Sequence, residues 1–206
     1  MSWPGRRGDL TRRDRLPRRP GGRGYRVLVL GGARSGKSAT AERLLAGRDQ
    51  VDYVATGAVP DASDPEWAAR VAIHQERRAP HWATLETRDL EGVLAAPDLS
   101  AAQLATPVLV DCLSTWLAGV MDECGVWSAA PGAGKALAAR VDGLLDAWRA
   151  TRRIVVAVSS EVGSGVVPGA ASGARYRDEL GLLNTRIAAQ CQRVWLCTAG
   201  IPRRLR

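Results

Sequence analysis

The chain has 206 residues, enough for one domain with a sizeable core, and 46% of them are hydrophobic, as in ordinary globular proteins. It contains no apolar run near the ~20 residues of a membrane span, and we expect neither a membrane span nor a secretory signal. Its four cysteines form no Cys-x-x-Cys pair, which disfavours a zinc site or a disulfide framework and favours a cytoplasmic protein, while its net charge of +8 raises the question of an anionic partner.

Most of that charge belongs to the first segment of the chain. Residues 1–24 hold eight arginines against two aspartates, a net of +6, which leaves +2 for residues 25–206. Their proline, glycine and arginine content predicts a basic, disordered N-terminal extension before a single domain over residues 25–206. The extension is either a solvated tail or a non-specific polyanion-binding segment, and the weakly charged remainder predicts no specific nucleic-acid partner.

The first predicted element is a buried strand that leads into a glycine-rich turn and a helix. Residues 27–30 are aliphatic, residues 31–38 read Gly-x-x-x-x-Gly-Lys-Ser, and residues 39–45 have helical character. This is the context of a P-loop, in which backbone amides surround a phosphate at the positive end of a helix, although an ordinary strand–turn–helix corner is the alternative. We expect Lys37 to reach the β- and γ-phosphates and Ser38 to bind Mg²⁺. The positions expected to contact nucleotide are Gly31, Gly32, Ala33, Arg34, Ser35, Gly36, Lys37 and Ser38.

A second short strand is predicted over residues 51–56, followed by a turn-rich segment and a helix over residues 65–78. Asp64 is suited to cap the start of that helix, and a proline follows it at the first helical position. We expect Trp67 and Val71 to pack inward from the helix.

His74 is the candidate nucleophile on this helix. Arg70, His74 and Arg78 recur every four residues and therefore share one face. Two neighbouring arginines disfavour a protonated imidazole and can bind phosphate oxygens, which suits a nucleophile, whereas the alternative is an ordinary solvated histidine. His81 has no such neighbours, and we interpret it as structural.

The rest of the chain alternates predicted strands with predicted helices, and residues 97–106 are expected to be a surface connection. The apolar strands are typical of a parallel sheet covered on both faces. The pattern predicts an α/β protein with a three-layer, P-loop NTPase-like fold, in which a mostly parallel sheet is flanked by helices. Strands are expected over residues 83–87, 107–111, 154–158 and 194–198, and helices over residues 88–96, 113–121, 135–150 and 178–191.

Two further features follow the ends of these strands. In P-loop proteins an acid at the carboxyl end of a strand beside the P-loop strand completes the Mg²⁺ site, and Asp111 has that place, although it could instead cap the next helix. The glycine-rich residues 159–168 follow another strand, where open α/β sheets place their ligands.

Two segments are especially distinctive: Gly-Gly-Ala-Arg-Ser-Gly-Lys-Ser at residues 31–38 and Glu-Val-Gly-Ser-Gly-Val-Val-Pro at residues 161–168. With them, the chain resembles the bifunctional adenosylcobinamide kinase / adenosylcobinamide-phosphate guanylyltransferase of cobalamin biosynthesis, from about residue 25 to its C-terminus. The chain departs from many relatives at Ser160 and Thr185 and from some relatives at Ile73. The other matching segments are residues 53–56, 69–78, 82–86, 110–113, 175–178 with Gly181 and Asn184, and 199–202.

The resemblance implies two reactions at one P-loop nucleotide-binding catalytic domain. A nucleoside triphosphate, ATP or GTP, phosphorylates the aminopropanol hydroxyl of adenosylcobinamide. GTP then guanylylates adenosylcobinamide phosphate, giving adenosylcobinamide-GDP and pyrophosphate. The family's covalent GMP carrier corresponds to His74, and Glu86 and Asp111 match acidic positions near the nucleotide in the family. Lys37 remains the expected catalytic lysine of the P-loop, with Ser38 and Asp111 as the expected Mg²⁺ ligands. The resemblance also implies a cytoplasmic homotrimer. Outside the P-loop, the residues expected to bind nucleotide are Ala55, Thr56, Gly57, Arg70, Gln75, Glu76, Arg77, Arg78, Glu86 and Asp111.

Two other functions are compatible with a P-loop. One is a kinase that acts on a different small molecule without a covalent step, and it leaves His74 between two arginines without a purpose. The other is a nucleotide-dependent switch or nucleic-acid motor anchored by the arginine-rich extension. The weak charge of residues 25–206 disfavours it.

Overall fold

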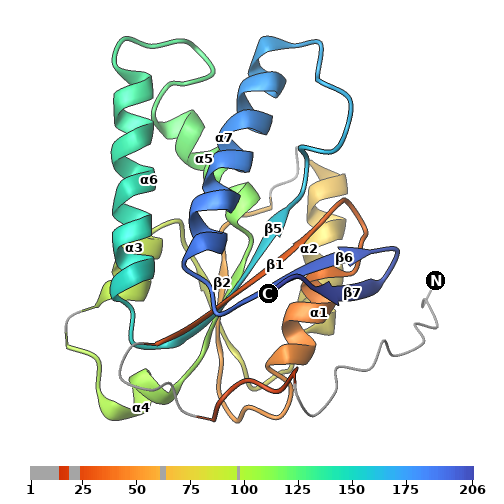
Figure 1. Ribbon diagram of the computed structural model, residues 1–206, viewed down its shortest axis with the longest axis vertical. Helices are drawn as coiled ribbons and strands as arrows, with labels where there is room; N and C mark the ends of the chain where they lie inside the picture. Colours follow the sequence, from red (N-terminus) through yellow and green to blue (C-terminus); the bar gives the residue numbers. More distant parts are fainter. Residues whose placement is uncertain (1–13, 19–23, 61–63, 97) are drawn as a thin grey trace.

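The computed structural model describes residues 14–18, 24–60, 64–96 and 98–206. Its strands form one sheet in the order β3-β2-β4-β5-β1-β6-β7 (Figure 1). All neighbouring strands are parallel except β6 and β7, so the predicted mostly parallel sheet is confirmed. The strands are β1 (Tyr25–Gly31), β2 (Asp52–Ala55), β3 (Ala83–Glu86), β4 (Val108–Asp111), β5 (Ile154–Ser160), β6 (Arg193–Thr198) and β7 (Ile201–Arg204).

Helices cover both faces of the sheet, which makes the fold three-layered as predicted. Figure 1 shows α1 and α2 on one side of the strands and the four helices α3, α5, α6 and α7 on the other. None of the helices in the described part of the chain is long and apolar enough to cross a membrane. The helices are α1 (Lys37–Leu44), α2 (Pro65–Arg77), α3 (Leu90–Ala95), α4 (Ala101–Ala105), α5 (Leu113–Glu123), α6 (Ala133–Ala150) and α7 (Ala171–Ala189).

Alternate residues of β1, β2, β4, β5 and β6 enter two separate hydrophobic cores. On β1, Leu28 packs with Trp116 of α5 and Trp148 of α6, whereas Val27 and Val29 belong to the core beneath α1. Successive side chains of a strand point to opposite faces, so a strand that is apolar at every position is buried on both. The apolar strands of the sequence thus require the two helical layers that the structure has.

The parallel register brings the functional segments to one edge of the sheet. Gly31 lies opposite Ser160, and Ala55 lies between Asp111 and Glu86. The loops that follow β1 to β5 therefore converge at the carboxyl ends of the strands, where α/β proteins bind ligands. One detail of the prediction was wrong: the strand that ends in Asp111 is not beside the P-loop strand, because β5 lies between β4 and β1.

Two local predictions were also wrong, and one strand was not predicted. The expected connection over residues 97–106 contains α4, which Ser100 and Gln103 begin by accepting hydrogen bonds from each other's backbone amides. This reciprocal capping box stabilises a short helix. Helix α7 begins at Ala171, seven residues before its predicted start, since a single Gly173 does not stop it. The chain after β6 turns at residues 199–200 and forms β7, antiparallel to β6.

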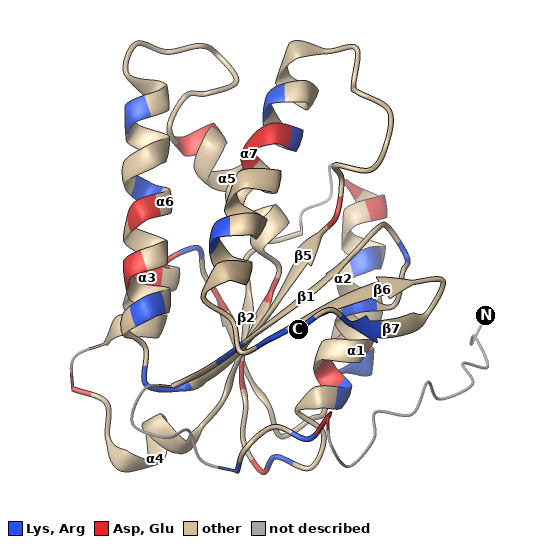
Figure 2. Cartoon of the chain, viewed as in Figure 1, with Lys and Arg blue, Asp and Glu red and all other residues tan. Residues whose placement is uncertain are grey.

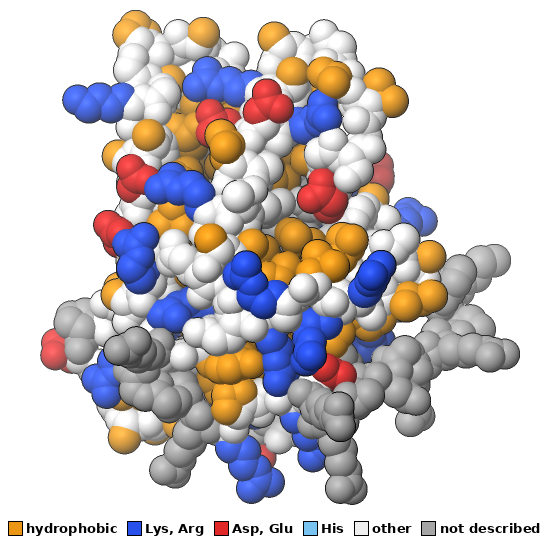
Figure 3. All heavy atoms as spheres, in the orientation of Figure 1, with side chains coloured by type: hydrophobic (Ala, Val, Ile, Leu, Met, Phe, Trp, Pro, Cys, Tyr) orange, Lys and Arg blue, Asp and Glu red, His pale blue; other side chains and the backbone are white. Residues whose placement is uncertain are grey.

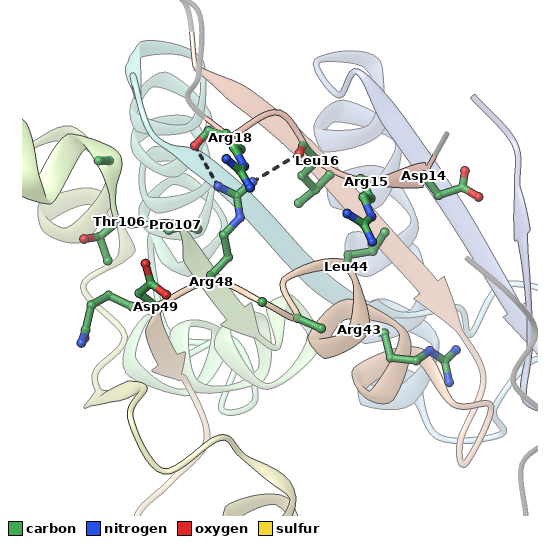
Figure 4. A pocket seen from close by; sticks show the side chains of 14 residues that line it. Asp14, Arg15, Leu16, Arg18, Arg43, Leu44, Arg48, Asp49, Thr106 and Pro107 are labelled. Carbon is green, nitrogen blue, oxygen red and sulfur yellow. Dashed lines mark hydrogen bonds between the residues drawn. The ribbon is translucent and has the colours of Figure 1, made fainter. Parts of the chain in front are cut away.

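Residues 14–18 of the predicted extension lie against the body of the protein (Figure 4). Leu16 is buried in the core beneath α1, and Arg48 donates hydrogen bonds to the backbone carbonyls of Leu16 and Arg18. Arg193 of β6 donates to the carbonyl of Asp14 at 2.7 Å. This docking differs from the disorder predicted for all of residues 1–24. The remaining parts of that prediction, residues 1–13 and 19–23, lie outside the described residues, as do residues 61–63 and 97 of the predicted connections.

Candidate active site

A cavity of about 670 Å³ lies at the carboxyl edge of the sheet, between the P-loop and α2. Its walls come from the loops after β1, β2, β4 and β5, from one side of α2 and from the end of β3. The structure brings most of the residues predicted to bind nucleotide together here. They are Ala33, Arg34, Ser35, Gly36, Lys37, Ser38, Ala55, Gly57, Arg70, His74, Arg77, Arg78, Glu86 and Asp111.

Five predicted residues are not among those that line the cavity. Gly31 and Gly32 lie at the base of the P-loop, and Gln75 and Glu76 are exposed elsewhere on α2. Thr56 is fully buried, and its hydroxyl donates to the carbonyl of Cys112 at 2.6 Å. Thr56 thus holds the turn between β4 and α5.

The P-loop has the backbone that its glycines allow. A Cβ atom on Gly31 would lie 2.7 Å from the backbone carbonyl oxygen of Cys197 and 2.3 Å from the Ser35 hydroxyl, so a larger residue would clash there. Gly36 has φ of +88° and precedes the first turn of α1, whose amides no described side chain caps. The amide of Gly200, in the β6–β7 turn, donates to the carbonyl of Ser35 at 3.0 Å. The loop is thereby fixed, with its helix N-terminus open to an anion.

Two cations of the P-loop have no carboxylate partner among the described contacts. The ammonium of Lys37 donates to the carbonyl of Gly32 at 3.1 Å, and this bond is exposed. Arg34 has a left-handed backbone, with φ of 54°, and lines the cavity. Both charges are available to phosphate oxygens.

Asp111 is the centre of the polar contacts in the cavity. Its Oδ1 accepts a hydrogen bond from Ser38 at 3.4 Å, and its Oδ2 accepts one from the Tyr53 hydroxyl at 2.6 Å. His74 Nδ1 lies 3.3 Å from the same Oδ2. Burial alone would raise the pKa of Asp111, but the hydrogen bonds from His74, Tyr53 and Ser38 lower it, so the carboxylate stays ionised.

The surroundings of His74 differ in part from those predicted. Arg70 lines the cavity as expected, but the guanidinium of Arg78 lies over the ring of Tyr53, 3.7 Å from its centre. The imidazole contacts the Asp111 carboxylate, which the spacing of the arginines does not indicate. With Nδ1 directed at Asp111, Nε2 is the ring nitrogen left for chemistry.

Helix α2 is a wall of the cavity rather than part of a core. None of its residues is buried, so the prediction that Trp67 and Val71 pack into the interior was wrong. Trp67 donates instead to the carbonyl of Ala58 at 2.8 Å and closes the loop after β2. Arg77 makes a bidentate pair with Glu42 of α1, with both N–O distances 2.8 Å, and ties the two helices together. Figure 2 shows the basic residues spaced along α2.

Several residues that the prediction missed also line the cavity. Tyr53 is the most important, and its place on β2 two residues before Ala55 could have revealed it, because such residues share a face of a strand. Cys112 and Ser114 contact each other at 2.8 Å. Tyr176 of α7 donates to the carbonyl of Ser114 at 3.0 Å, a contact between distant segments that no local pattern indicated.

Ser38 and Asp111 fit a Mg²⁺ site. Magnesium prefers hard oxygen ligands and usually takes one or two from protein, with phosphate oxygens and water completing its shell. The hydroxyl of Ser38 and the carboxylate of Asp111 already meet at the mouth of the P-loop. The described residues contain no group of three or more His, Cys, Asp or Glu that could hold a metal by themselves.

Known proteins are similar to this chain over most of its length. The "bifunctional adenosylcobalamin biosynthesis protein CobP" of Pseudomonas aeruginosa is 40% identical over 184 residues, which is 86% of this chain and 95% of that protein. The proteins named CobU from Escherichia coli and Salmonella typhimurium are 34% and 35% identical, each over 85% of this chain and 96% of their own length. Among solved structures, a prototypical ATPase from the type III secretion system of pathogenic bacteria has a TM-score of 0.47 and 12% identity over 84% of this chain and 51% of that one, too low to bear on function.

The cobinamide kinase / cobinamide phosphate guanyltransferase family matches residues 27–205. This range begins within β1 and includes the P-loop, α2, the acid at the end of β4 and the glycine-rich loop after β5. The chain belongs to the cobinamide kinase / cobinamide phosphate guanyltransferase family.

Proposed function

We propose that this enzyme phosphorylates adenosylcobinamide with ATP or GTP and then transfers GMP from GTP to adenosylcobinamide phosphate through a covalent bond to His74. As a member of its family, the chain is a bifunctional cobinamide kinase and guanylyltransferase. The observation that carries the finer proposal is the placement of His74 in the same cavity as the P-loop, with Nδ1 3.3 Å from Asp111.

In the kinase step, the P-loop amides and Lys37 bind the β- and γ-phosphates. The aminopropanol hydroxyl of adenosylcobinamide attacks the γ-phosphorus, and the bond from that phosphorus to the nucleoside diphosphate breaks. Ser38 and Asp111 would hold Mg²⁺, which when bound supplies positive charge to the phosphate oxygens. Phosphoryl transfer needs little beyond this positioning and charge.

In the guanylyl step, His74 Nε2 attacks the α-phosphorus of GTP, and the bond to pyrophosphate breaks. The Nδ1 proton stays directed at Asp111, whose carboxylate balances the positive charge that the ring acquires. A phosphate oxygen of adenosylcobinamide phosphate then attacks the same phosphorus and displaces His74. Lys37, Arg34 and Arg70 provide positive charge for the departing pyrophosphate.

The test is to incubate the protein with GTP labelled at the α-phosphate and Mg²⁺, without any corrinoid. A phosphoramidate adduct should form, with release of pyrophosphate, and it should be labile in acid and stable in alkali. His74→Asn should abolish the label while adenosylcobinamide is still phosphorylated. His81→Asn is the matched control, because His81 lies outside the cavity with Nε2 3.2 Å from the carbonyl of Arg48. Undiminished labelling of His74→Asn would move the carrier to another residue.

We further propose that the enzyme is a cytoplasmic homotrimer, on the strength of the family resemblance. The loop after β5 exposes Val166 and Val167, which are 94% and 61% accessible in the single chain, and such apolar residues are suited to burial against another copy. Three chains of 22.0 kDa give about 66 kDa, which light scattering after gel filtration measures directly. A mass of one chain at micromolar concentration would contradict the trimer.

A further inference from the structure

Tyr53 is the buried group in the cavity for which neither reaction has yet supplied a purpose. Its side chain is 1% exposed on β2, and its hydroxyl donates to Asp111 Oδ2 at 2.6 Å. That oxygen is also the one nearest His74 Nδ1. The other carboxylate oxygen, Oδ1, accepts from Ser38 at the P-loop. The two oxygens of Asp111 thus have different neighbours: Oδ2 faces His74 and Tyr53, and Oδ1 faces Ser38 of the P-loop.

The Tyr53 side chain is fixed by its surroundings more firmly than the His74 side chain. The Tyr53 ring belongs to the core beneath α1, and the guanidinium of Arg78 covers its other face. His74 stands on α2, which has no buried residue. The Tyr53 hydroxyl donates to Asp111 Oδ2, so the buried ring limits where that oxygen can lie.

We propose that Tyr53 is a positioning residue for guanylylation: its hydroxyl fixes the rotation of the Asp111 carboxylate so that Oδ2 meets His74 Nδ1 and Nε2 faces the nucleotide. This inference rests on the proposed function of His74. Without the hydroxyl, the Asp111 carboxylate can rotate about its χ2 bond, which is a soft torsion. The His74 ring is then no longer held in one orientation. The kinase step does not use His74, so it depends on Tyr53 less.

The test is Tyr53→Phe, which removes one oxygen atom and keeps the ring. Loss of a residue that orients a metal-binding histidine typically costs about 10-fold to 100-fold in activity, and we expect a fall of similar size in the maximal rate of adduct formation. The GTP concentration at half-maximal rate should stay within about twofold, because Tyr53 orients an attacking group and does not bind the nucleotide. The ratio of adduct formation to phosphorylation of adenosylcobinamide should therefore fall.

Tyr25→Phe is the matched control. Tyr25 lies on β1 with the guanidinium of Arg193 5.7 Å from its ring centre, and it is not among the residues that line the cavity. The same loss of a hydroxyl there should change neither rate. Equal losses of both activities in Tyr53→Phe would show a merely structural role and overturn the inference.

A double-mutant cycle makes the test independent of any loss of stability. If Tyr53 acts through Asp111, then Tyr53→Phe should cost adduct formation much less in an Asp111→Asn background than in the wild type. Equal costs in the two backgrounds would overturn the inference. The two proposals also fail separately: labelling that survives His74→Asn refutes the carrier, whereas labelling lost in His74→Asn but normal in Tyr53→Phe refutes only the role of Tyr53.

Discussion

Lys37 is one of two lysines in the chain, and the two provide a direct test of the P-loop. Lys37 lies over the loop with its ammonium on the Gly32 carbonyl, whereas Lys135 is exposed on α6. We expect Lys37→Ala to lower both half-reactions by about 10²–10³-fold, as the loss of one electrostatic contact to a transition state typically does. Lys135→Ala should leave them unchanged. Steady-state rates of phosphorylation and adduct formation measure both, and near-normal turnover of Lys37→Ala would refute the P-loop assignment.

The four cysteines should react at very different rates. Burial raises the pKa of Cys191 to about 12, and it also raises the pKa of Cys197. Because the thiolate is the reactive form, only about one Cys191 in 10⁴ is ionised at pH 8. Cys112 and Cys124 are half-buried. Peptide mapping after iodoacetamide should therefore find these two modified first, and Cys191 and Cys197 only in denaturant.

Nucleotide should protect one of the two reactive cysteines. Cys112 lines the cavity, whereas Cys124 follows the end of α5 and does not. GTP should slow the alkylation of Cys112 and leave that of Cys124 unaltered. Equal protection of both, or of neither, would place the nucleotide elsewhere.

Single residues were predictable where a function depends on spacing along the chain. The P-loop and the i, i+4 relation of Arg70 and His74 are of this kind, and the structure places them in one cavity. The contact of Asp111 with Tyr53 and His74 joins β4, β2 and α2. No local pattern fixes how a helix crosses the end of a sheet, so this contact required the structure.

At the scale of elements, residues 14–18 form a short segment, here called the strap, that packs against the core beneath α1. Removing residues 1–18 should lower the free energy of unfolding by about 2–3 kcal/mol, since Leu16 is buried and Arg48 loses its carbonyl partners. Urea denaturation measures the loss. Deleting residues 1–13 alone keeps the strap and is the control. If the two deletions are equally stable, then the docking of residues 14–18 contributes nothing.

Elements were predictable where their packing leaves a pattern in the sequence. The buried strands β1, β4 and β5 and the amphipathic helix α6 all appear near their predicted positions. The start of α7 was missed because Gly173 weakens the local signal while Tyr176 secures the helix through a contact with α5. β7 was missed because its residues lack the apolar pattern of a buried strand. They form a strand only through backbone hydrogen bonds to β6.

At the scale of the whole molecule, the charge of the body is balanced and that of the extension is not. Figure 3 shows basic and acidic side chains interspersed on one face. In the described part of the chain, Arg140 pairs with Glu123 and Arg186 with Asp142. Residues 1–13 carry four arginines and one aspartate, so their removal lowers the net charge from +8 to +5. Elution from heparin should then need less salt, because fewer counterions are released on binding. Elution at the same salt concentration would show that the body binds polyanions by itself.

The order of the strands has a consequence for the protein during its synthesis. The P-loop sequence ends at residue 38, yet β1 lies between β5 and β6 in the folded sheet. The carbonyl of Ser35 accepts its hydrogen bond from the amide of Gly200. At roughly 5–20 residues per second, the ribosome needs about 8–30 s to supply those neighbours. We therefore expect a nascent chain that already carries the full Gly-Gly-Ala-Arg-Ser-Gly-Lys-Ser sequence to lack the finished nucleotide site, so that GTP does not assist the early stages of folding. The site should form only after β6 has paired with β1 and Gly200 has reached Ser35.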